Sequence, residues 1–466
     1  MAVNHNFPVA VIGAGPIGLA AAAHLLERGL EPLIFEAGPA AAAAIEQWRH
    51  IRLFSPWQFN VDAAALRLLD ATGWESPGSG DLPTGGELID EYLAPLASLP
   101  AIASRLHTGA RVLAVTRQGM DKTHSRNRRA TPFVVRVEHA DGEVRDYQAA
   151  GVIDASGTWS TRNPLGTSGL PAVGEAGAAA RISSPLPDVL GRDRGMFQGR
   201  TSLVVGAGHS AANTVINLSE LAAEVPGTKT VWAIRGASAA RVYGGGDADG
   251  LAARGRLGSR LRRLVESGAV ELHTGFGIAA LSTADGALTL TSTDGRTLKA
   301  DVVVPATGFR PDLGILSELR LELDPAVEAP RELGPLIDPE FHSCGTVEPH
   351  GARMLAHPEE DFYIVGMKSY GRAPTFLLAT GYEQVRSVAA ALAGDQEAAD
   401  SVQLELPETG VCSSDIGTSC DVPGAVPAGA APAGFVAETS GGCCGAPEPV
   451  LVGFPTGLTH GRSGGN

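Results

Sequence analysis

The sequence contains little cysteine and no long apolar run. Five cysteines in 466 residues are too few for a disulfide scaffold, which excludes the small secreted proteins that depend on one. No apolar stretch reaches the roughly 18 residues that a membrane span requires. The N-terminal segment MAVNHNFPVAVIGAG has no basic region ahead of its apolar part, so it is not typical of a secretory signal. We therefore expect a cytoplasmic protein without a membrane partner.

The sequence is also short of positive charge. Its 36 Lys and Arg residues against 51 Asp and Glu residues give a formal net charge of -15. Such an excess of negative charge disfavours nucleic acid and anionic membranes as partners. The length suggests two or three domains with a large buried core. The expected partner is a small-molecule substrate, and a homodimer is compatible with these features.

A pattern of apolar strand, glycine-rich turn and alanine-rich helix occurs twice. The first copy, VAVIGAGPIGLA, begins at Val9, and the second, LVVGAGHSAAN, begins at Leu203. Between Val9 and about Gly394 the chain alternates short apolar runs with helical patterns, which is typical of parallel sheets. The sequence therefore predicts an α/β fold with two Rossmann-like dinucleotide-binding domains.

The first copy contains a complete G-x-G-x-x-G motif. Its first glycine permits the tight turn, its second lets the backbone approach a pyrophosphate, and its third lets helix and strand pack closely. The next predicted strand, 33–36, ends in an acid that can accept hydrogen bonds from a ribose 2′-hydroxyl. The alternative is a glycine-rich turn without a ligand, which the strand, the spacing and the acid together disfavour. The candidate residues are Gly13, Gly15, Pro16, Ile17, Gly18 and Glu36.

The second copy is G-x-G-x-x-A, and its next predicted strand, 230–234, ends in Arg235. A cation there cannot accept from a 2′-hydroxyl but can pair with a 2′-phosphate, which favours NADPH over NADH. Arg241 is a second candidate for the same phosphate, and a solvated surface arginine is the alternative for Arg235. The candidate residues in the turn and the first helical turn are Gly206, Gly208, His209, Ser210 and Ala211.

Two further strands end in small, glycine-containing turns, VIDASG from Val152 and VVVPATGFRPD from Val302. Such turns let the backbone come close to a cofactor, although they could equally be ordinary strand ends. Ala155, Gly157 and Gly308 are the candidate cofactor contacts in them.

Together these segments resemble the flavoproteins that have two dinucleotide-binding domains and, more narrowly, the flavin-containing monooxygenase-like group. GAGHSA from Gly206 matches the G-x-G-x-S-A NADPH motif of that group, and DASGTW from Asp154 is similar to its A-T-G-x-W-like segment. LPTGGELIDEYL from Leu82 looks like the characteristic helix that precedes that segment. The resemblance covers about residues 8–394. It implies FAD on the first motif, NADPH on the second, and hydride transfer between them.

The resemblance also implies roles for two loop residues. Trp48 would lie along the flavin, and Asn60 would lie near the flavin ring as a candidate catalytic residue. A loop asparagine that satisfies its own turn is the alternative for Asn60.

The chain departs from the family pattern in ways that leave the reaction open. The F-x-G-x-x-x-H-x-x-x-W signature of oxygen-inserting enzymes is missing before Gly206, and no C-x-x-C flanks either nucleotide motif. The leading hypothesis is an NADPH-dependent, monooxygenase-like flavoprotein with a role in arsenic resistance. The first alternative is an NADPH-dependent reductase of a thiol-bound metalloid or a disulfide. The second alternative is a flavoprotein that binds a metalloid without turnover.

The arsenic hypothesis comes from a resemblance, because flavoproteins of this general layout are found among arsenic-resistance proteins, and the tail cysteines strengthen it. Cys443 and Cys444 are a vicinal pair whose thiolates suit a soft ion, and Cys412 or Cys420 could add the third thiolate that trivalent arsenic prefers. Mercuric reductases resemble this arrangement in having a vicinal pair near a mobile C-terminus. Cys344 is either a small core residue or the inner acceptor of a thiol relay. The alternative is a disordered tail with incidental cysteines.

The predicted domains follow from these motifs. An FAD-binding domain comprises residues 1–195 and 300–398, and an NAD(P)H-binding domain, 196–299, is inserted into it. Residues 399–466 are rich in Gly, Pro and Ala and cannot bury enough apolar surface to order themselves, so a flexible tail is expected.

Overall fold

The computed structural model describes residues 6–244, 252–284, 287–339, 347–373 and 376–404. Cys344, Cys412, Cys420, Cys443 and Cys444 lie outside these residues, and so does the thiolate site predicted from the four tail cysteines. Among the described residues, no helix is both long enough and apolar enough to cross a bilayer.

One parallel sheet organises what we call the first lobe. Its five strands have the order β15-β7-β1-β2-β3. They are β1 (Val9–Ile12), β2 (Pro32–Phe35), β3 (Leu106–His107), β7 (Gly151–Asp154) and β15 (Phe362–Ile364). Because all five run in the same direction, the residues that follow them meet at one edge of the sheet. Gly13, Glu36 and Ala155 lie at that edge.

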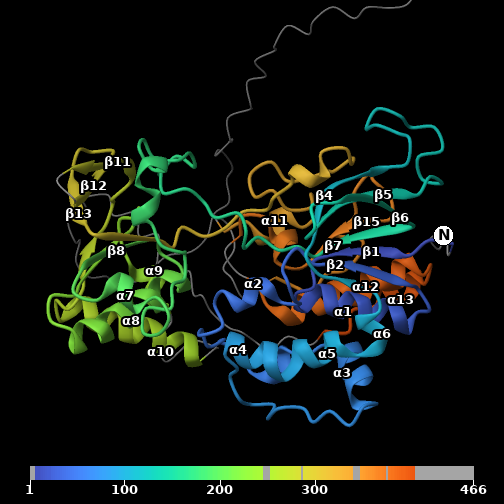
Figure 1. Cartoon of the computed structure of the whole chain (residues 1–466), viewed down its shortest axis with the longest axis horizontal. Helices are drawn as coiled ribbons and strands as arrows, with labels where there is room; N and C mark the ends of the chain where they lie inside the picture. Colours follow the sequence, from blue (N-terminus) through green and yellow to red (C-terminus); the bar gives the residue numbers. More distant parts are fainter. Residues whose placement is uncertain (1–5, 245–251, 285–286, 340–346, 374–375, 405–466) are drawn as a thin grey trace, which may run out of the picture. The chain divides into compact units, whose positions relative to one another are not determined.

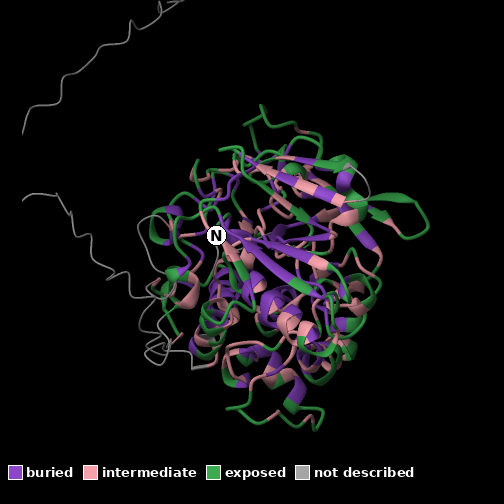
Figure 2. Cartoon of the chain, turned by 90° about the vertical axis from the view of Figure 1, so that its left-hand side faces the viewer, coloured by how far each residue is buried: buried purple, intermediate pink, exposed green. Residues whose placement is uncertain are grey.

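The central strands β1 and β7 bury both faces, which explains their unbroken or nearly unbroken apolar sequences. Val9, Val11 and Ile153 pack in a core with the helices, whereas Ala10 and Val152 face a second, antiparallel sheet. Figure 1 shows the helices on one side of the parallel strands and the antiparallel strands on the other, and Figure 2 shows the central strands as buried. The helices of this layer include α1 (Pro16–Glu27), α3 (Ala63–Asp70) and α12 (Leu378–Leu392); the antiparallel strands are β4 (Ala110–Arg117), β5 (Phe133–His139) and β6 (Val144–Ala149).

A second parallel sheet, with the order β10-β9-β8-β14, organises the second lobe in the same way. Val204 and Trp232 share a core with the helices, and Leu203 and Val231 pack against an antiparallel sheet, so the three layers of the first lobe are repeated. The elements are β8 (Thr201–Val205), α8 (His209–Glu224), β9 (Lys229–Ala233), α9 (Ala240–Tyr243), α10 (Ala252–Glu266), β10 (Glu271–His273), β11 (Ile278–Ala284), β12 (Ala287–Ser292), β13 (Thr297–Ala300) and β14 (Val302–Pro305).

The boundaries predicted for the inserted domain, 196 and 299, are too narrow. Leu165 and Ala178 pack in the core of the second lobe, and β14 pairs in register with β8. The second lobe therefore extends from about residue 165 to residue 305. Residues 165–190 have little strand or helix periodicity, and a strand's own sequence does not reveal which sheet it joins, so the sequence did not show either extension.

Two short connections between the lobes pair with each other. The amide of Asn163 donates to the carbonyl of Gly308 at 2.9 Å, and the amide of Arg310 donates to that of Thr161 at 3.0 Å. The described fold also continues beyond the predicted start of the tail at 399, because α13 (Gln396–Asp400) packs on α12 through the Ser387 hydroxyl, which donates to the carbonyl of Ala399.

The remaining helices are short. They include α2 (Ala43–Glu46), α4 (Gly85–Glu87), α5 (Ala94–Ser98), α6 (Pro100–Ala103), α7 (Arg194–Phe197) and α11 (Gly334–Ile337). The helix expected within 82–93 begins at α4, where Thr84 and Glu87 form a capping box, and continues through a π-helical segment, Leu88–Leu93, into α5.

Candidate functional site

The glycine turn after β1 divides into structural and open positions. Gly13 has φ +95°, and a Cβ on it would lie 2.9 Å from the carbonyl oxygen of Ala155. A Cβ on Gly18 would lie 1.9 Å from the carbonyl oxygen of Gly13. Gly15 differs, because its φ is −76° and no atom lies within 4 Å of its Cβ position. The fold itself requires the first and third glycines, whereas the second leaves open space beside the first turn of α1.

That open space faces a helix N-terminus. Gly15 caps the 12-residue α1 without any side-chain hydrogen bond, and Pro16 occupies the first turn, where its missing N–H costs nothing. The remaining first-turn amides and the positive end of the helix dipole favour an anion. Ile17 is buried in the core of the first lobe, so its side chain positions the helix. This geometry fits the pyrophosphate of a dinucleotide.

Glu36 is held in place at the end of β2 by the same turn. Its carboxylate accepts from the backbone amides of Ala14 and Gly38, both at 2.8 Å. Each carboxylate oxygen has further lone pairs, so the group can still accept hydrogen bonds from a ribose.

The turn after β8 repeats this division. Gly206 has φ +135°, and a Cβ on it would lie 2.0 Å from the carbonyl oxygen of Ala306. Gly208 has nothing within 4 Å of its Cβ position and caps the 16-residue α8 without a side-chain bond. Ala211, in the place of the third glycine, is fully buried. His209 and Ser210 form the first turn of α8 beside the open position.

Arg235 lies just past β9 and is exposed. Within the described part of the chain, neither Arg235 nor Arg241, which is also exposed on α9, has an ion-pair partner. Their charge is compatible with a 2′-phosphate, and that role stays a prediction for both residues.

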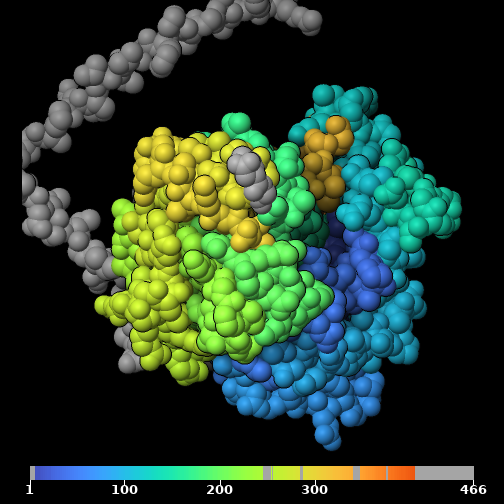
Figure 3. All heavy atoms as spheres, turned by 60° about the vertical axis from the view of Figure 1, so that its left-hand side comes forward, coloured from blue at the N-terminus to red at the C-terminus, as the bar shows by residue number. Residues whose placement is uncertain are grey.

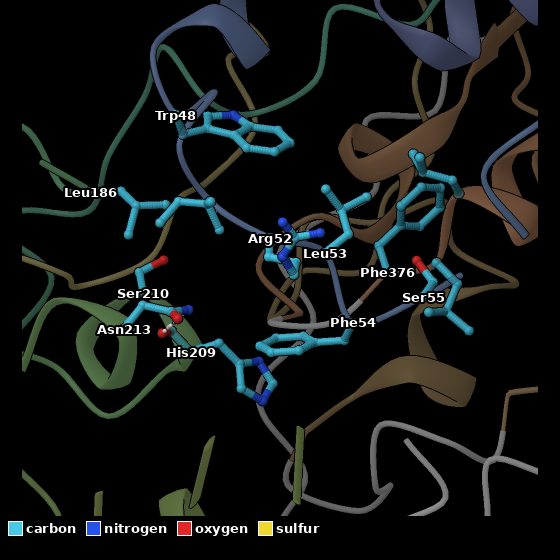
Figure 4. A pocket seen from close by; sticks show the side chains of 13 residues that line it. Trp48, Arg52, Leu53, Phe54, Ser55, Leu186, His209, Ser210, Asn213 and Phe376 are labelled. Atoms are coloured by element: carbon cyan, nitrogen blue, oxygen red, sulfur yellow. Dashed lines mark hydrogen bonds between the residues drawn. The ribbon is translucent and has the colours of Figure 1, made fainter. Parts of the chain in front are cut away.

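A cavity of about 370 Å³ connects the second turn to the first lobe (Figure 4). The cavity brings together two groups of predicted residues, Trp48 from the first lobe and His209 with Ser210 from α8. Figure 3 shows the green residues of the second lobe adjoining the blue residues of the first. The described residues that line it are Trp48, Ile51, Arg52, Leu53, Phe54, Ser55, Leu186, His209, Ser210, Asn213, Phe376, Leu377 and Leu378.

The wall formed by residues 51–55 is fixed by backbone pairing. The amide of Gly85 donates to the carbonyl of Ile51, and the amide of Leu53 donates to that of Pro83, both at 2.8 Å. Trp48 lies so close to Gly85 that a Cβ there would contact its ring at 2.9 Å. The ring of Phe54 meets that of His209 edge to face, with 5.0 Å between their centroids.

Asn60 is buried, and its side chain satisfies its own loop. Its Oδ1 accepts from the Ser55 hydroxyl at 2.8 Å, and its Nδ2 donates to the carbonyls of Ser55 and Pro56. This is the alternative expected for a loop asparagine, and it places Asn60 behind Ser55 in the cavity wall. A role beside a flavin ring stays a prediction.

Gly157 and Gly308 both have positive φ, of +69° and +81°, on the two connections between the lobes. Ala155 continues β7, because its amide donates to the carbonyl of Ile12 at 2.9 Å. The structure therefore explains why small residues occupy these turns, while their contact with a cofactor stays a prediction.

A buried ion pair that the sequence motifs do not predict lies beneath the first turn. The ammonium of Lys368 donates to Asp154 at 2.6 Å and to the hydroxyl of Ser156 at 3.0 Å, and the side chains of Lys368 and Asp154 are fully buried. Ser156 lies directly beside Gly13. The pair fixes the turn after β7 to the segment after β15. A lysine directly after the apolar run 362–367 was the available signal, because lysine is seldom buried unless it is paired.

Among the described residues, no group of three or more His, Cys, Asp or Glu side chains could hold a metal ion.

Comparison with known families identifies this arrangement. Residues 10–332 match the model of the pyridine nucleotide-disulphide oxidoreductases. The chain belongs to this family. A curated relative, the ferredoxin–NADP reductase of Paramagnetospirillum magneticum (strain ATCC 700264 / AMB-1), is 31% identical over 138 residues, which are 28% of this chain and 36% of the reductase. The match thus spans about a third of that relative's length.

Solved structures of similar fold include a reductase and a monooxygenase. The bacillithiol disulfide reductase of Bacillus cereus aligns with a TM-score of 0.61 and 19% identity over 83% of this chain and 99% of its own. The cadaverine monooxygenase DfoA of Erwinia amylovora, bound to FAD, aligns with a TM-score of 0.59 and 14% identity over 86% and 96% of the two chains.

The family confirms three predictions. The α/β fold with Rossmann-like domains is correct, and the protein is a flavoprotein oxidoreductase. FAD and a nicotinamide dinucleotide are the cofactors seen or named among these proteins, as predicted. Proteins of similar fold include both a reductase and a monooxygenase, so the fold does not choose between the reactions.

Proposed function

We propose that the protein is an NADPH-oxidising FAD enzyme of the monooxygenase type. One observation supports this above all. A glycine turn with an open second glycine occurs at the carboxyl edge of both parallel sheets, and the helix that follows the second of these turns, α8, lines the cavity with its first turn. Two such sites, with a cavity between the second of them and the first lobe, are what hydride transfer between two cofactors requires.

Each cofactor is assigned to one lobe by the residue after the second strand. Glu36, held by two backbone amides, suits the unphosphorylated ribose of FAD, and Arg235 suits the 2′-phosphate of NADPH. The open positions at Gly15 and Gly208 leave room for the two pyrophosphates. Bound FAD supplies the electron transfer from NADPH to a second substrate.

The cavity wall favours dioxygen as the oxidant. Its first-lobe side presents Trp48, Phe54 and Phe376 with several leucines, and an apolar wall excludes water from the reacting atoms.

The sequence supports a second candidate, an NADPH-dependent reductase of a thiol-bound metalloid or a disulfide. Cys443 and Cys444 are adjacent, and a vicinal thiol pair suits a disulfide or a trivalent arsenical as substrate. In this case the tail would deliver the bound substrate, with Cys412 or Cys420 as a third thiolate and Cys344 as an inner acceptor.

A stopped-flow experiment separates the two candidates. The FAD-loaded protein is reduced with NADPH without oxygen and then mixed either with dioxygen, in the presence and absence of arsenite, or with a disulfide under anaerobic conditions. We expect a transient absorbing species with dioxygen and substrate-dependent NADPH consumption that survives the double change Cys443→Ser/Cys444→Ser. Featureless reoxidation by dioxygen, with rapid reoxidation by a thiol-bound oxidant that the double change abolishes, would contradict the monooxygenase proposal. Failure of NADPH to reduce the flavin at all would contradict both candidates.

A further inference from the structure

The cavity wall contains one formally charged side chain among its described residues. Arg52 lies among aromatic and aliphatic neighbours, the other polar lining residues are neutral hydroxyl, amide and imidazole groups, and no carboxylate is present (Figure 4). An apolar wall beside a cation leaves that cation as the main source of charge on the cavity surface. The charge of this lining therefore favours an anionic substrate for the proposed enzyme.

Arg52 is held on a rigid segment. Its backbone pairs with Thr84 in a short antiparallel bridge, between the hydrogen bonds that tie Ile51 to Gly85 and Leu53 to Pro83. Its Nη1 donates to the carbonyl of Leu82. The guanidinium is thus oriented before any ligand arrives, which reduces the entropy that binding must overcome.

Most of the donors of Arg52 stay available. The structure gives no partner within the described residues for its Nε or Nη2 groups. Glu87 is the nearest carboxylate, 3.6 Å from Nη1, which is beyond hydrogen-bonding distance. Glu87 is instead engaged in its capping box, where it accepts from the amide of Thr84 at 2.6 Å. Both side chains are half exposed, so their mutual attraction is weak.

The exposure of Arg52 also sets the orientation of a ligand. Its side chain is 57% exposed, so the guanidinium lies at the mouth of the cavity. Trp48, Phe54 and Phe376 are the aromatic residues of the wall, and all three are less exposed than Arg52. A ligand that fits both parts has an anionic group at one end and an apolar body at the other.

We propose that this cavity binds a small organic acid, whose carboxylate pairs with the free edge of Arg52 while its apolar body packs on the aromatic wall. The Nε and Nη2 groups form the planar pair of donors that a carboxylate accepts in a bidentate manner. This inference rests on the proposed function, because it names the substrate class of the same cavity. No carboxylate among the described lining residues could pair with an amine or another cation, and a neutral molecule leaves the guanidinium edge unpaired.

The test is a binding titration on the FAD-loaded protein. The probes are phenylacetate, indole-3-acetate and octanoate, each compared with its neutral primary amide, and binding is followed by the change in flavin absorbance. The variants are Arg52→Met and Arg52→Lys. The matched control is Arg49→Met, since Arg49 is paired with Glu46 and Asp90 at 3.0 and 2.8 Å and does not line the cavity.

We expect at least one acid to bind the wild-type protein more tightly than its amide. Arg52→Met should weaken that acid about fivefold without affecting the amide, because a charge-assisted pair at a half-exposed mouth contributes about 1 kcal/mol. Arg52→Lys should recover part of the affinity, and Arg49→Met should bind like the wild type. The preference for the acid should shrink as salt is added.

Three results would overturn the proposal. These are acids that bind no better than their amides, acids whose affinity Arg52→Met leaves unchanged, or a rise in the KM for NADPH in Arg52→Met without any loss of acid binding. The last result would assign Arg52 to the nucleotide. Flavin reduction by NADPH is measured separately in the wild type, so a failure of the proposed function would be visible independently of the titration.

Discussion

The second glycine of the first turn offers a test that separates folding from cofactor binding. Gly15 has an ordinary φ of −76° and nothing within 4 Å of its Cβ position, so the fold can accommodate valine there. The cost to folding should not exceed about 1 kcal/mol, which is the penalty of an apolar residue at a helix N-cap. The side chain would, however, enter the space assigned to the FAD pyrophosphate. We expect Gly15→Val to lower the flavin affinity at least tenfold, or about 1.4 kcal/mol.

For the neighbouring glycines, Gly13 and Gly18, we expect substitutions to reduce the stability of the fold itself. Gly13→Ala should destabilise the protein even without flavin, because the left-handed conformation costs a residue with a Cβ about 1–2 kcal/mol. Gly18→Ala should cost about 1–3 kcal/mol through overpacking against the Gly13 carbonyl. The matched control is Gly195→Val, because Gly195 is exposed on α7 and has nothing within 4 Å of its Cβ position.

The assay has two parts, the flavin-to-protein absorbance ratio after purification and denaturant unfolding of the flavin-free protein. Gly15→Val should lose flavin and keep its unfolding midpoint, and Gly195→Val should keep both. A Gly15→Val protein with full flavin content would refute the assignment of this turn to a pyrophosphate. An equal loss of stability in the flavin-free Gly15→Val and Gly18→Ala proteins would refute the division into open and structural glycines.

Three other predictions concern the second nucleotide, the buried charges and pH. Arg235→Ala should raise the KM for NADPH about tenfold and leave the KM for NADH unchanged, because only NADPH has a 2′-phosphate. Steady-state kinetics with both nucleotides would test this. An equal rise in both KM values would show that Arg235 does not bind the 2′-phosphate. Glu359→Gln should lower the free energy of unfolding, measured by urea denaturation, by about 3–5 kcal/mol. The buried guanidiniums of Arg117 and Arg128 lie 2.8 Å from this carboxylate and would lose their counter-charge. A change below about 1 kcal/mol, which is typical of a surface pair, would contradict the structure. Burial lowers the pKa of His357 to about 4, below its ordinary value of about 6.5, so its contribution to stability is complete above pH 6.5 and is lost as the pH falls toward 4, by about 3 kcal/mol in total. His357→Gln should flatten this part of the pH profile of unfolding, and an unchanged profile would show that other groups produce it.

The local sequence pattern was sufficient to predict the glycine turns after β1 and β8, because the packing of each turn depends on one short segment. Gly13, Gly18 and Gly206 meet backbone atoms that no Cβ could approach, so the glycine spacing itself reports the geometry. Glu36 follows β2, which pairs in parallel with β1 of the same βαβ unit. The apolar strands were equally visible, since both faces of each parallel sheet are covered.

Long-range contacts were not visible in the same way. Lys368 and Asp154 are 214 positions apart in the sequence, and only the parallel pairing of β15 with β7 brings them together. The predicted boundaries at 196 and 299 were too narrow because β14 joins the sheet of the second lobe, which its apolar sequence alone does not specify. The cavity combines segments 48–55, 209–213 and 376–378, and Arg52 gained a role only when those segments met.

The sequence by itself therefore determined the family of fold, the two glycine turns and the class of enzyme, because each of these depends on residues within about one βαβ unit. The tertiary structure alone decided the extent of the second lobe, the buried pair of Lys368 and Asp154, and the identity of the residues around the cavity. Those features depend on contacts between distant segments, and the free energy of such contacts comes from burial and pairing that no local pattern encodes.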